Sequence, residues 1–336
     1  RQVQITSSKG MLNFPQPPKS YASLYLEETD KPLPKKINPN TRYTMFSTIA
    51  TGGKSLIKSC KDLHLCRFVC YKTLRPEFIE DEIEQQRLLR EARVSAMLQH
   101  PNTVPTYELG RDGRGNYYFT MKLVHGYTMR EILDFRERYD LTQLVDVIVQ
   151  IGHALQYAHT HGVAHRDIKP ENILVGPYGE VLLLDWGLAK VWKSDGSTVE
   201  DPASEEESAE ALTITGHGKL QGTASYMSPE QINRDPNIDH RTDIYSLGAI
   251  LYEILAGRSP FVGDKVHEVI SSTLKDDPPV PSAMSKQPIP AVLEQSAMRC
   301  LQKNPGQRFE SISQLLRELQ QDWKVDLALS STKDSK

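Results

Sequence analysis

The chain has 336 residues, of which 38% are hydrophobic and 25% are charged, and its formal net charge at pH 7 is -3. This composition favours a globular protein over a disordered or fibrous one, and the length fits one large two-lobed unit with tails. A mildly acidic chain has no overall field that attracts nucleic acid. The sequence has no apolar run of about 18 residues that could span a membrane. We therefore expect a cytoplasmic protein, and an anchor outside these residues stays compatible with that expectation.

The N-terminal part of the chain predicts a tail followed by a small sheet-rich lobe. Proline clusters within residues 1–41 disfavour regular elements, so a tail is expected there. From residue 42 the pattern favours antiparallel strands, and residues 80–99 then change to helical spacing, with Glu91 beside the apolar stripe. The expected strands lie at 43–49, 55–59, 66–72 and 117–124.

From residue 125 onward the chain predicts a larger helical lobe. Thr128 and Glu131 have the spacing of a capping box, so a helix is expected to open there. Acidic residues crowd the segment near 195–210, which predicts a solvated loop, and an inert insertion and a regulatory element are both left open as its role. Further helices are expected around the apolar stripe at 144–158 and at 241–256, 291–303 and 311–322.

Two short stretches carry the residues that point to a chemistry. The run HRDIKPEN occupies residues 165–172, and the run DWG follows at 185–187. Phosphoryl transfer needs a carboxylate at the hydroxyl nucleophile, oxygen ligands for Mg²⁺ and cations on the phosphates. Together, the two stretches resemble the catalytic loop and the metal-binding loop of the protein kinase family.

This resemblance implies a fold and a domain organisation. The fold is an α+β bilobal protein-kinase fold, in which a small antiparallel-sheet lobe with one key helix precedes a larger helical lobe. The expected segments are a tail at 1–41, a kinase domain at 42–323 with lobes 42–124 and 125–323, an activation segment at 185–230 with the acidic insertion near 195–210, and a tail at 324–336.

The resemblance also implies roles for residues of the two stretches. Asp167 is expected to orient the substrate hydroxyl and accept its proton, and Lys169 to steady the transferred phosphate. Asn172 and Asp185 are the expected ligands of Mg²⁺, because hard oxygen donors suit a small hard cation. A lysine at position 169 is typical of serine/threonine kinases, so Ser and Thr hydroxyls are the expected acceptors.

The resemblance extends to a nucleotide site in the small lobe. Lys72 is expected to contact the α and β phosphates of ATP, and Glu91 to pair with it. The family loop G-x-G-x-x-G-x-V reads ATGGKSLI at 50–57, where Ala and Ser replace two glycines, so a stiffer or more distant loop is expected. The expected ATP contacts are Ile49, Ala50, Gly52, Gly53, Ile57, Cys70, Lys72, Met121, Lys122, Val124 and Leu174.

An arginine directly before Asp167 accompanies activation by phosphorylation in the family. Two threonines of the activation segment are expected to be autophosphorylated, because a phosphate there would pair with Arg166 and Lys190. A homodimer is left open as the species that carries out this reaction. The expected regulatory residues are the two threonines Thr213 and Thr215, together with Thr223 and Arg166.

Three further residues are expected to act as structural supports. The run GTASYMSPE at 222–230 resembles the end of an activation segment, with Ser228 in place of the usual alanine. The resemblance implies that Glu230 pairs with Arg308 and that Asp243 anchors the backbone of the catalytic loop.

The implied function is that of a serine/threonine protein kinase, similar to the eukaryotic-like kinases of bacteria. The expected cofactors are ATP and Mg²⁺, with Mn²⁺ as an alternative, and the expected partners are protein substrates, with no nucleic acid and no membrane segment within these residues. The alternative is a pseudokinase that acts as a binding or scaffolding module, which the substituted glycine loop favours. Retention of Lys72, Asp167, Asn172 and Asp185 favours the active enzyme.

Overall fold

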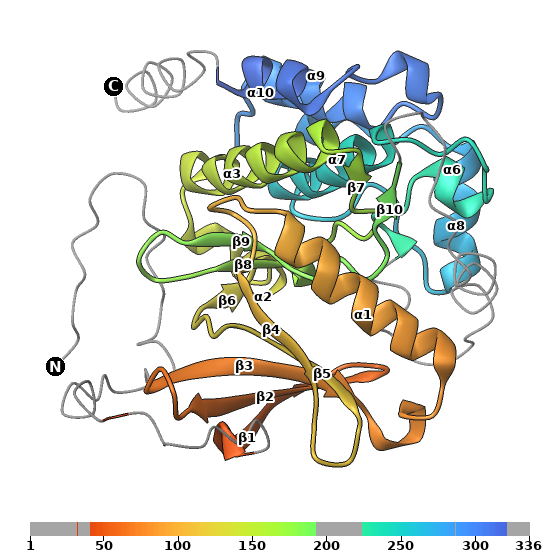
Figure 1. The fold of residues 1–336 in the computed structure, drawn as a ribbon. Coiled ribbons are helices and arrows are strands. Elements are labelled where there is room, and N and C mark those ends of the chain that lie inside the picture. The colour runs from red at the N-terminus through yellow and green to blue at the C-terminus, as the bar shows by residue number, and fades with distance from the viewer. Residues whose placement is uncertain (1–31, 33–40, 193–223, 286, 321–336) are drawn as a thin grey trace, which may run out of the picture.

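The computed structural model describes residues 32, 41–192, 224–285 and 287–320, and these residues form two lobes (Figure 1). The smaller lobe contains helix α1 (Glu82–Met97) and a five-stranded antiparallel sheet with the order β1-β2-β3-β5-β4. This confirms the predicted sheet-rich lobe with one helix. Its strands are β1 (Tyr43–Thr51), β2 (Ser55–Asp62), β3 (Arg67–Leu74), β4 (Thr106–Arg111) and β5 (Tyr117–Lys122).

Strand β4 is absent from the elements expected from the sequence. Its residues are only partly buried, so the alternation that marks a half-buried strand is weak. It forms the edge of the sheet and pairs with β5 alone. Strand β5 ends at Lys122, two residues before the expected end, and the Lys122 N–H donates to the Pro105 carbonyl at 3.0 Å.

The register of the sheet places the expected nucleotide contacts on one face. Ile57 pairs with Lys72 across β2 and β3, and Cys70 pairs with Met121 across β3 and β5. Cross-strand partners share a face, and so do residues two apart in one strand, so these four side chains lie on the same face. The opposite face carries a separate buried cluster, consisting of Tyr43, Cys60, Val69, Tyr71 and Tyr118.

Helix α1 begins two residues later than expected because Asp81 caps it. The Asp81 carboxylate accepts hydrogen bonds from the backbone N–H groups of Ile83 and Glu84, which satisfies two donors of the first turn. The helix packs on the sheet through Leu88 and Ala92, which form a buried cluster with Leu74 and Phe119. The cap therefore sets where the helix begins, and its apolar face holds it on the sheet.

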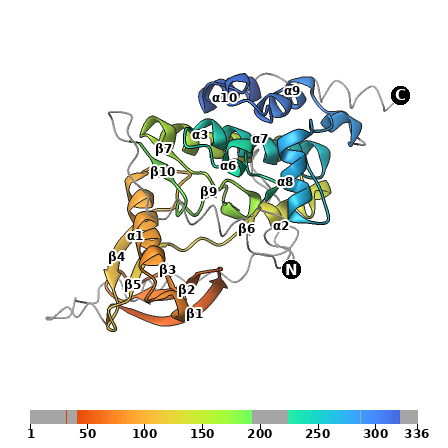
Figure 2. The same ribbon diagram turned by 90° about the vertical axis from the view of Figure 1, so that its right-hand side faces the viewer.

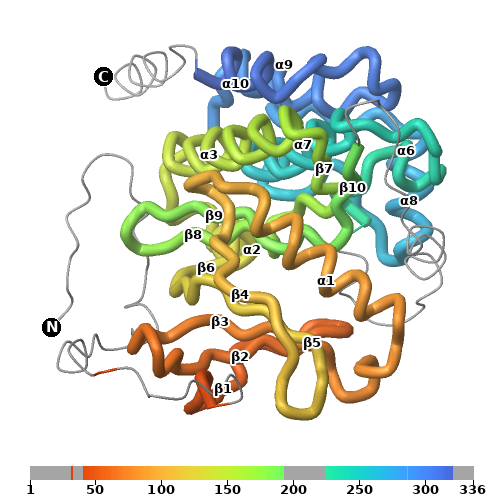
Figure 3. Tube along the Cα trace, in the orientation of Figure 1, coloured from red at the N-terminus to blue at the C-terminus, as the bar shows by residue number. Residues whose placement is uncertain are grey.

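The larger lobe is mainly helical, as predicted. Thr128 and Glu131 form the expected capping box at the start of α2. Helix α7 is buried along nearly its whole length, and Figure 3 shows it beside α3 at the centre of the lobe. The helices are α2 (Met129–Leu133), α3 (Leu141–Thr160), α6 (Pro229–Ile232), α7 (Arg241–Ala256), α8 (Val266–Lys275), α9 (Ala291–Cys300) and α10 (Ile312–Leu319).

A small sheet lies on the side of the larger lobe that faces the five-stranded sheet (Figure 2). It consists of β6 (Tyr127–Thr128), β8 (Ile173–Val175) and β9 (Val181–Leu183). Strands β7 (Val163–Ala164) and β10 (Lys190–Val191) form a second pair nearby. The two expected motif stretches lie directly before β8 and directly after β9, so the hairpin between these strands brings them together.

Two helices of the larger lobe end earlier than expected. Helix α9 ends at Cys300 and α10 at Leu319, each three residues before the predicted end. Gly248 of α7 explains how closely α9 packs, since a Cβ at Gly248 would lie 2.1 Å from the Cys300 Cβ. Among the described residues, none of the helices combines the length and apolar character needed to cross a membrane.

Candidate active site

A buried ion pair links α1 to β3. Lys72 Nζ lies 2.6 and 2.8 Å from the two carboxylate oxygens of Glu91, and both side chains are less than a tenth exposed. Asp185, which follows β9 in the larger lobe, has Oδ1 at 3.9 Å from Lys72 Nζ. The ammonium of Lys72 therefore stands between carboxylates of the two lobes.

The neighbouring charges determine the protonation of Lys72 and Asp185. Burial alone would lower the pKa of Lys72, but the negative charges of Asp185 and Glu91 outweigh it and raise this pKa above its usual value. The positive charge of Lys72 lowers the pKa of Asp185. Lys72 is thus a permanent cation and Asp185 a permanent anion at neutral pH.

The loop between β7 and β8 holds the second group of expected residues. Lys169 Nζ donates to both carboxylate oxygens of Asp167, at 2.9 and 2.8 Å. Asn172 Nδ2 donates to Asp167 Oδ2 at 2.9 Å and to the Asp167 carbonyl at 2.8 Å. The Asp167 carboxylate is therefore fixed in one orientation by a charge and by an amide.

Backbone pairing places Asn172 next to Asp185. The Leu184 N–H donates to the Asn172 carbonyl at 2.8 Å, and Ile173 pairs with Leu183 in the β8–β9 hairpin. Asn172 Nδ2 faces Asp167, and among the described residues no hydrogen-bond donor reaches Asn172 Oδ1 or Asp185 Oδ2. Two hard oxygens thus have no protein donor on the described chain, which fits the donor set of a Mg²⁺ site.

A buried carboxylate from α7 holds the loop that contains residues 165–172. Asp243 accepts hydrogen bonds from the backbone N–H groups of His165 and Arg166, each at 2.8 Å. His159 Nε2 lies 2.8 Å from the same carboxylate. Burial would raise the pKa of Asp243, but these hydrogen bonds and the nearby His165 lower it below its usual value. The support keeps Arg166 in its left-handed conformation, at φ 69°.

His159 is a support that sequence reasoning missed. It lies in the last turn of α3 and meets Asp243 across a separation of 84 residues. A lone histidine at a helix end has no spacing that identifies a partner so far along the chain.

Trp186, beside Asp185, is buried in the larger lobe. Its ring lies 4.5 Å from the ring of His165, measured between centroids, and its exposure is 1%. Its indole N–H has no hydrogen-bond partner among the described residues. His165 in turn accepts from the Asp167 N–H at Nδ1 and contacts the Leu184 carbonyl through Nε2. The two motif stretches are therefore packed against each other.

The expected ion pair between Glu230 and Arg308 also forms. Arg308 is fully buried and donates to both carboxylate oxygens of Glu230, at 2.6 and 2.7 Å. Ser228 caps α6 in a capping box with Gln231, and Gln231 Nε2 donates to the Arg166 carbonyl at 2.6 Å. Gln231 thus connects α6 to the catalytic loop, a contact that no sequence pattern indicated.

Of the residues expected to take part in regulation, the structure describes Arg166 and Lys190. Burial and the positive charge of Arg166 lower the pKa of Lys190, so the two cations act on one another. Lys190 Nζ also donates to the carbonyls of Pro236 and Ile238. Thr213, Thr215, Thr223 and the acidic segment near 195–210 lie outside the described residues.

Comparison with known proteins identifies the family of the chain. The family model of the protein kinase domain matches residues 43–322, so the chain belongs to the protein kinase domain family. This confirms the predicted bilobal kinase fold and the resemblance to the bacterial kinases.

Bacterial serine/threonine kinases are among the relatives of the chain. It is 34% identical over 280 residues to a probable serine/threonine-protein kinase of Clostridium acetobutylicum, an alignment that covers 83% of this chain and 40% of the relative. It is 33% identical over 281 residues to the serine/threonine-protein kinase PknB of Mycolicibacterium smegmatis, covering 83% and 42% of the two chains. The chain therefore spans about two fifths of the length of these relatives.

Proposed function

We propose that this domain transfers the γ-phosphoryl group of ATP to serine and threonine hydroxyls of proteins. The observation that carries this proposal is the distance of 3.9 Å between Lys72 Nζ, in the small lobe, and Asp185 Oδ1, in the larger lobe. Phosphoryl transfer depends mainly on positioning and on the stabilisation of charge, and this arrangement supplies fixed cations and anions for both. Membership of the kinase family and the printed names of the bacterial relatives point the same way.

Each side chain has one task in the proposed reaction. Lys72 binds the α and β phosphates, and Glu91 holds its ammonium in place. Asp167 orients the acceptor hydroxyl and receives its proton as the hydroxyl oxygen bonds to the γ-phosphorus and the bond from that phosphorus to the bridging oxygen of the leaving ADP breaks. Lys169 stays beside the transferred phosphoryl group, because its contact with Asp167 holds it at the same point.

Asn172 and Asp185 would hold Mg²⁺, since their free oxygens are the ligands that this cation prefers. A bound divalent cation would neutralise part of the phosphate charge. The expected nucleotide contacts on the sheet face, among them Ile57, Cys70 and Met121, would enclose the adenine side of the nucleotide.

We also propose the domain limits and the regulation that the sequence predicts. The kinase domain spans 42–323, with the lobes meeting at residues 124 and 125. A phosphate on Thr213 or Thr215 would be attracted by the cations of Arg166 and Lys190, whose mutual repulsion it would relieve.

Label transfer tests the proposed function. The purified chain, incubated with γ-labelled ATP, Mg²⁺ and a generic basic protein, is expected to label that protein on serine and threonine, as read by acid hydrolysis and separation of the phosphoamino acids. A chelator added before ATP is expected to abolish the signal. Labelling of tyrosine alone, or an absence of label at micromolar enzyme, would contradict the proposal.

A further inference from the structure

The turn between β1 and β2 is tied to helix α1 by a side-chain ion pair. Lys54 Nζ donates to Glu84 Oε1 at 2.6 Å, and the Glu84 side chain is only 6% exposed. Arg87, one turn further along α1, pairs with the same carboxylate. Glu84 lies in the first turn of α1, where the helix dipole stabilises a negative charge. The turn expected to cover the nucleotide is therefore fastened to the helix that carries Glu91.

Hydrogen bonds from Arg75, the residue after β3, also fix the turn. The Arg75 N–H donates to the Lys54 carbonyl at 2.9 Å, and Arg75 Nη1 donates to the Gly53 carbonyl at 3.0 Å. Gly52 N–H closes the turn onto the Ser55 carbonyl at 2.9 Å. The conformation of the turn is thus set by contacts with the end of β3 and with α1, although two of the three family glycines are replaced.

Helix α1 presents two buried carboxylates on one face. Glu84, Leu88 and Glu91 are spaced by four and three residues and are all buried, so they share a face of the helix. The spacing of seven positions between Glu84 and Glu91 corresponds to two turns, or about 10 Å along the axis. The first carboxylate holds Lys54 and the second holds Lys72.

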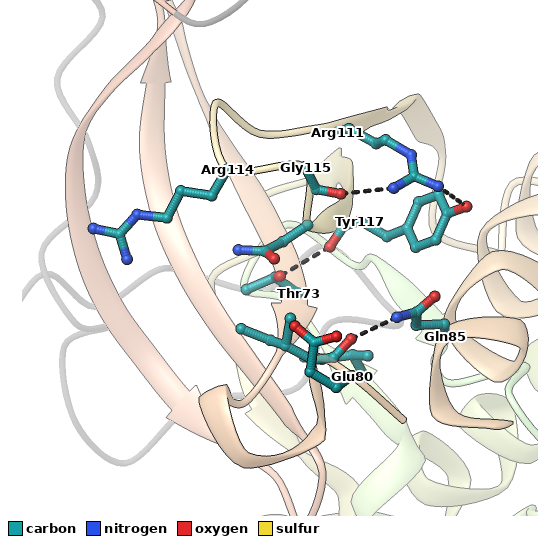
Figure 4. Close-up of a pocket in the computed structure, with 10 residues that line it drawn as sticks. Thr73, Glu80, Gln85, Arg111, Arg114, Gly115 and Tyr117 are labelled. Carbon is teal, nitrogen blue, oxygen red and sulfur yellow. Dashed lines mark hydrogen bonds between the residues drawn. The ribbon is translucent and has the colours of Figure 1, made fainter. Parts of the chain in front are cut away.

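Side-chain hydrogen bonds also fix the segment just before α1 and the end of β3. Gln85 Nε2 donates to the Ile79 carbonyl at 2.6 Å, and Thr73 at the end of β3 donates to the Tyr117 carbonyl at 2.9 Å. Figure 4 shows both contacts beside a pocket that Arg111 and Gly115 of the β4–β5 hairpin help to line.

We propose that Lys54 is a positioning residue that couples the nucleotide-covering turn to the Lys72–Glu91 pair through Glu84 and helix α1. This inference rests on the proposed function, because it assigns Lys54 a task in nucleotide binding. The Lys54–Glu84 ion pair joins the turn to α1, so the position of the turn over the phosphates and the inward position of the helix depend on each other. The turn lacks two of the three family glycines and their flexibility, and the Lys54–Glu84 pair positions it instead.

Removal of the ammonium tests the coupling. Lys54→Met is expected to raise the KM for ATP roughly tenfold with a smaller change in kcat, because Lys54 acts on nucleotide placement and a charge-assisted hydrogen bond is lost. Lys54→Arg retains the charge and is expected to keep the KM near that of the wild type. Lys58→Met, a change of the same kind on β2, is the matched control and is expected to leave the KM unchanged.

A double-variant comparison shows whether Lys54 acts through Glu84. Glu84→Gln, which also removes the pair with Arg87, is expected to raise the KM at least as much as Lys54→Met does, and the combined variant is expected to be no worse than Glu84→Gln alone, because that change already removes the contact with Lys54. Strictly additive effects on the logarithm of KM would overturn the proposal.

Amide hydrogen exchange gives a readout that a merely structural role would not change. In the wild type, Mg²⁺ and ATP are expected to slow exchange within residues 83–93 of α1. This slowing is expected to fall to less than half in Lys54→Met and to persist in Lys58→Met. An equal slowing in Lys54→Met and the wild type would refute the coupling.

The same experiment separates this inference from the proposed function. A chain that bound ATP without transferring phosphate would contradict the kinase activity, and the nucleotide-dependent exchange would still decide the coupling. A chain that bound no ATP would contradict both, because Lys54 would then have no nucleotide to position.

Discussion

Replacement of Asp167 by asparagine is expected to slow phosphoryl transfer by a factor of roughly 10²–10⁴, the range over which a positioned general base contributes. The amide has nearly the same shape as the carboxylate, and its oxygen can still accept from Asn172 Nδ2 and Lys169 Nζ. It cannot receive the proton of the acceptor hydroxyl. The loss should therefore appear in kcat, measured by label transfer at saturating ATP, while ATP affinity changes little.

Asp264→Asn provides the matched control for this variant. Asp264 is exposed and lies two residues before the start of α8, outside the groups assigned to the reaction. Its replacement is expected to leave kcat unchanged. An Asp167→Asn enzyme with the rate of the wild type would show that Asp167 is not the base, whatever its position in the loop.

Replacement of Arg308 by methionine is expected to destabilise the domain by about 3–5 kcal/mol, the usual cost of leaving one partner of a buried ion pair uncompensated. The guanidinium uses all of its N–H donors. Two bind Glu230, and the others bind the carbonyls of Gln302, Lys303 and Arg241 at 2.8 to 3.1 Å. A fall in melting temperature of roughly 10 °C follows from a loss of this size and is measurable by calorimetry.

Two further variants make this prediction specific. Changing Glu230 and Arg308 together to methionine is expected to restore part of the lost stability, because the buried charge left behind is removed as well. Arg317→Met, on the exposed side of α10, is expected to shift the melting temperature very little. A melting temperature of Arg308→Met equal to that of the wild type would contradict the role of the pair as a support.

Much of the fold could be predicted because its signals are local. The capping box at Thr128 and Glu131 forms where its spacing predicted, and the apolar pattern located helix α7 with its observed ends, Arg241 and Ala256. The residues expected in the catalytic loop could be predicted for the same reason, since Asp167, Lys169 and Asn172 are close in sequence and contact one another directly.

Contacts between distant residues could not be predicted without the family pattern. Lys54 and Glu84 are 30 residues apart, and His159 and Asp243 are 84 residues apart. Such pairs depend on how the sheet and helices pack, and the spacing of residues along the sequence does not indicate this packing. Helix ends were also placed too late, because the apolar pattern continues past the residue at which α9 stops, Cys300, while the backbone already turns at Leu301.

The central claim is that Lys72 and Asp185, from different lobes, act on one metal-bound ATP. Calorimetric titration of ATP into the wild type, Lys72→Met and Asp185→Asn, each with and without Mg²⁺, measures this directly. The expected result is that Mg²⁺ strengthens ATP binding to the wild type, that Lys72→Met weakens binding in both conditions, and that Asp185→Asn removes most of the Mg²⁺ effect. Equal affinities in all three proteins, with no effect of Mg²⁺, would contradict it.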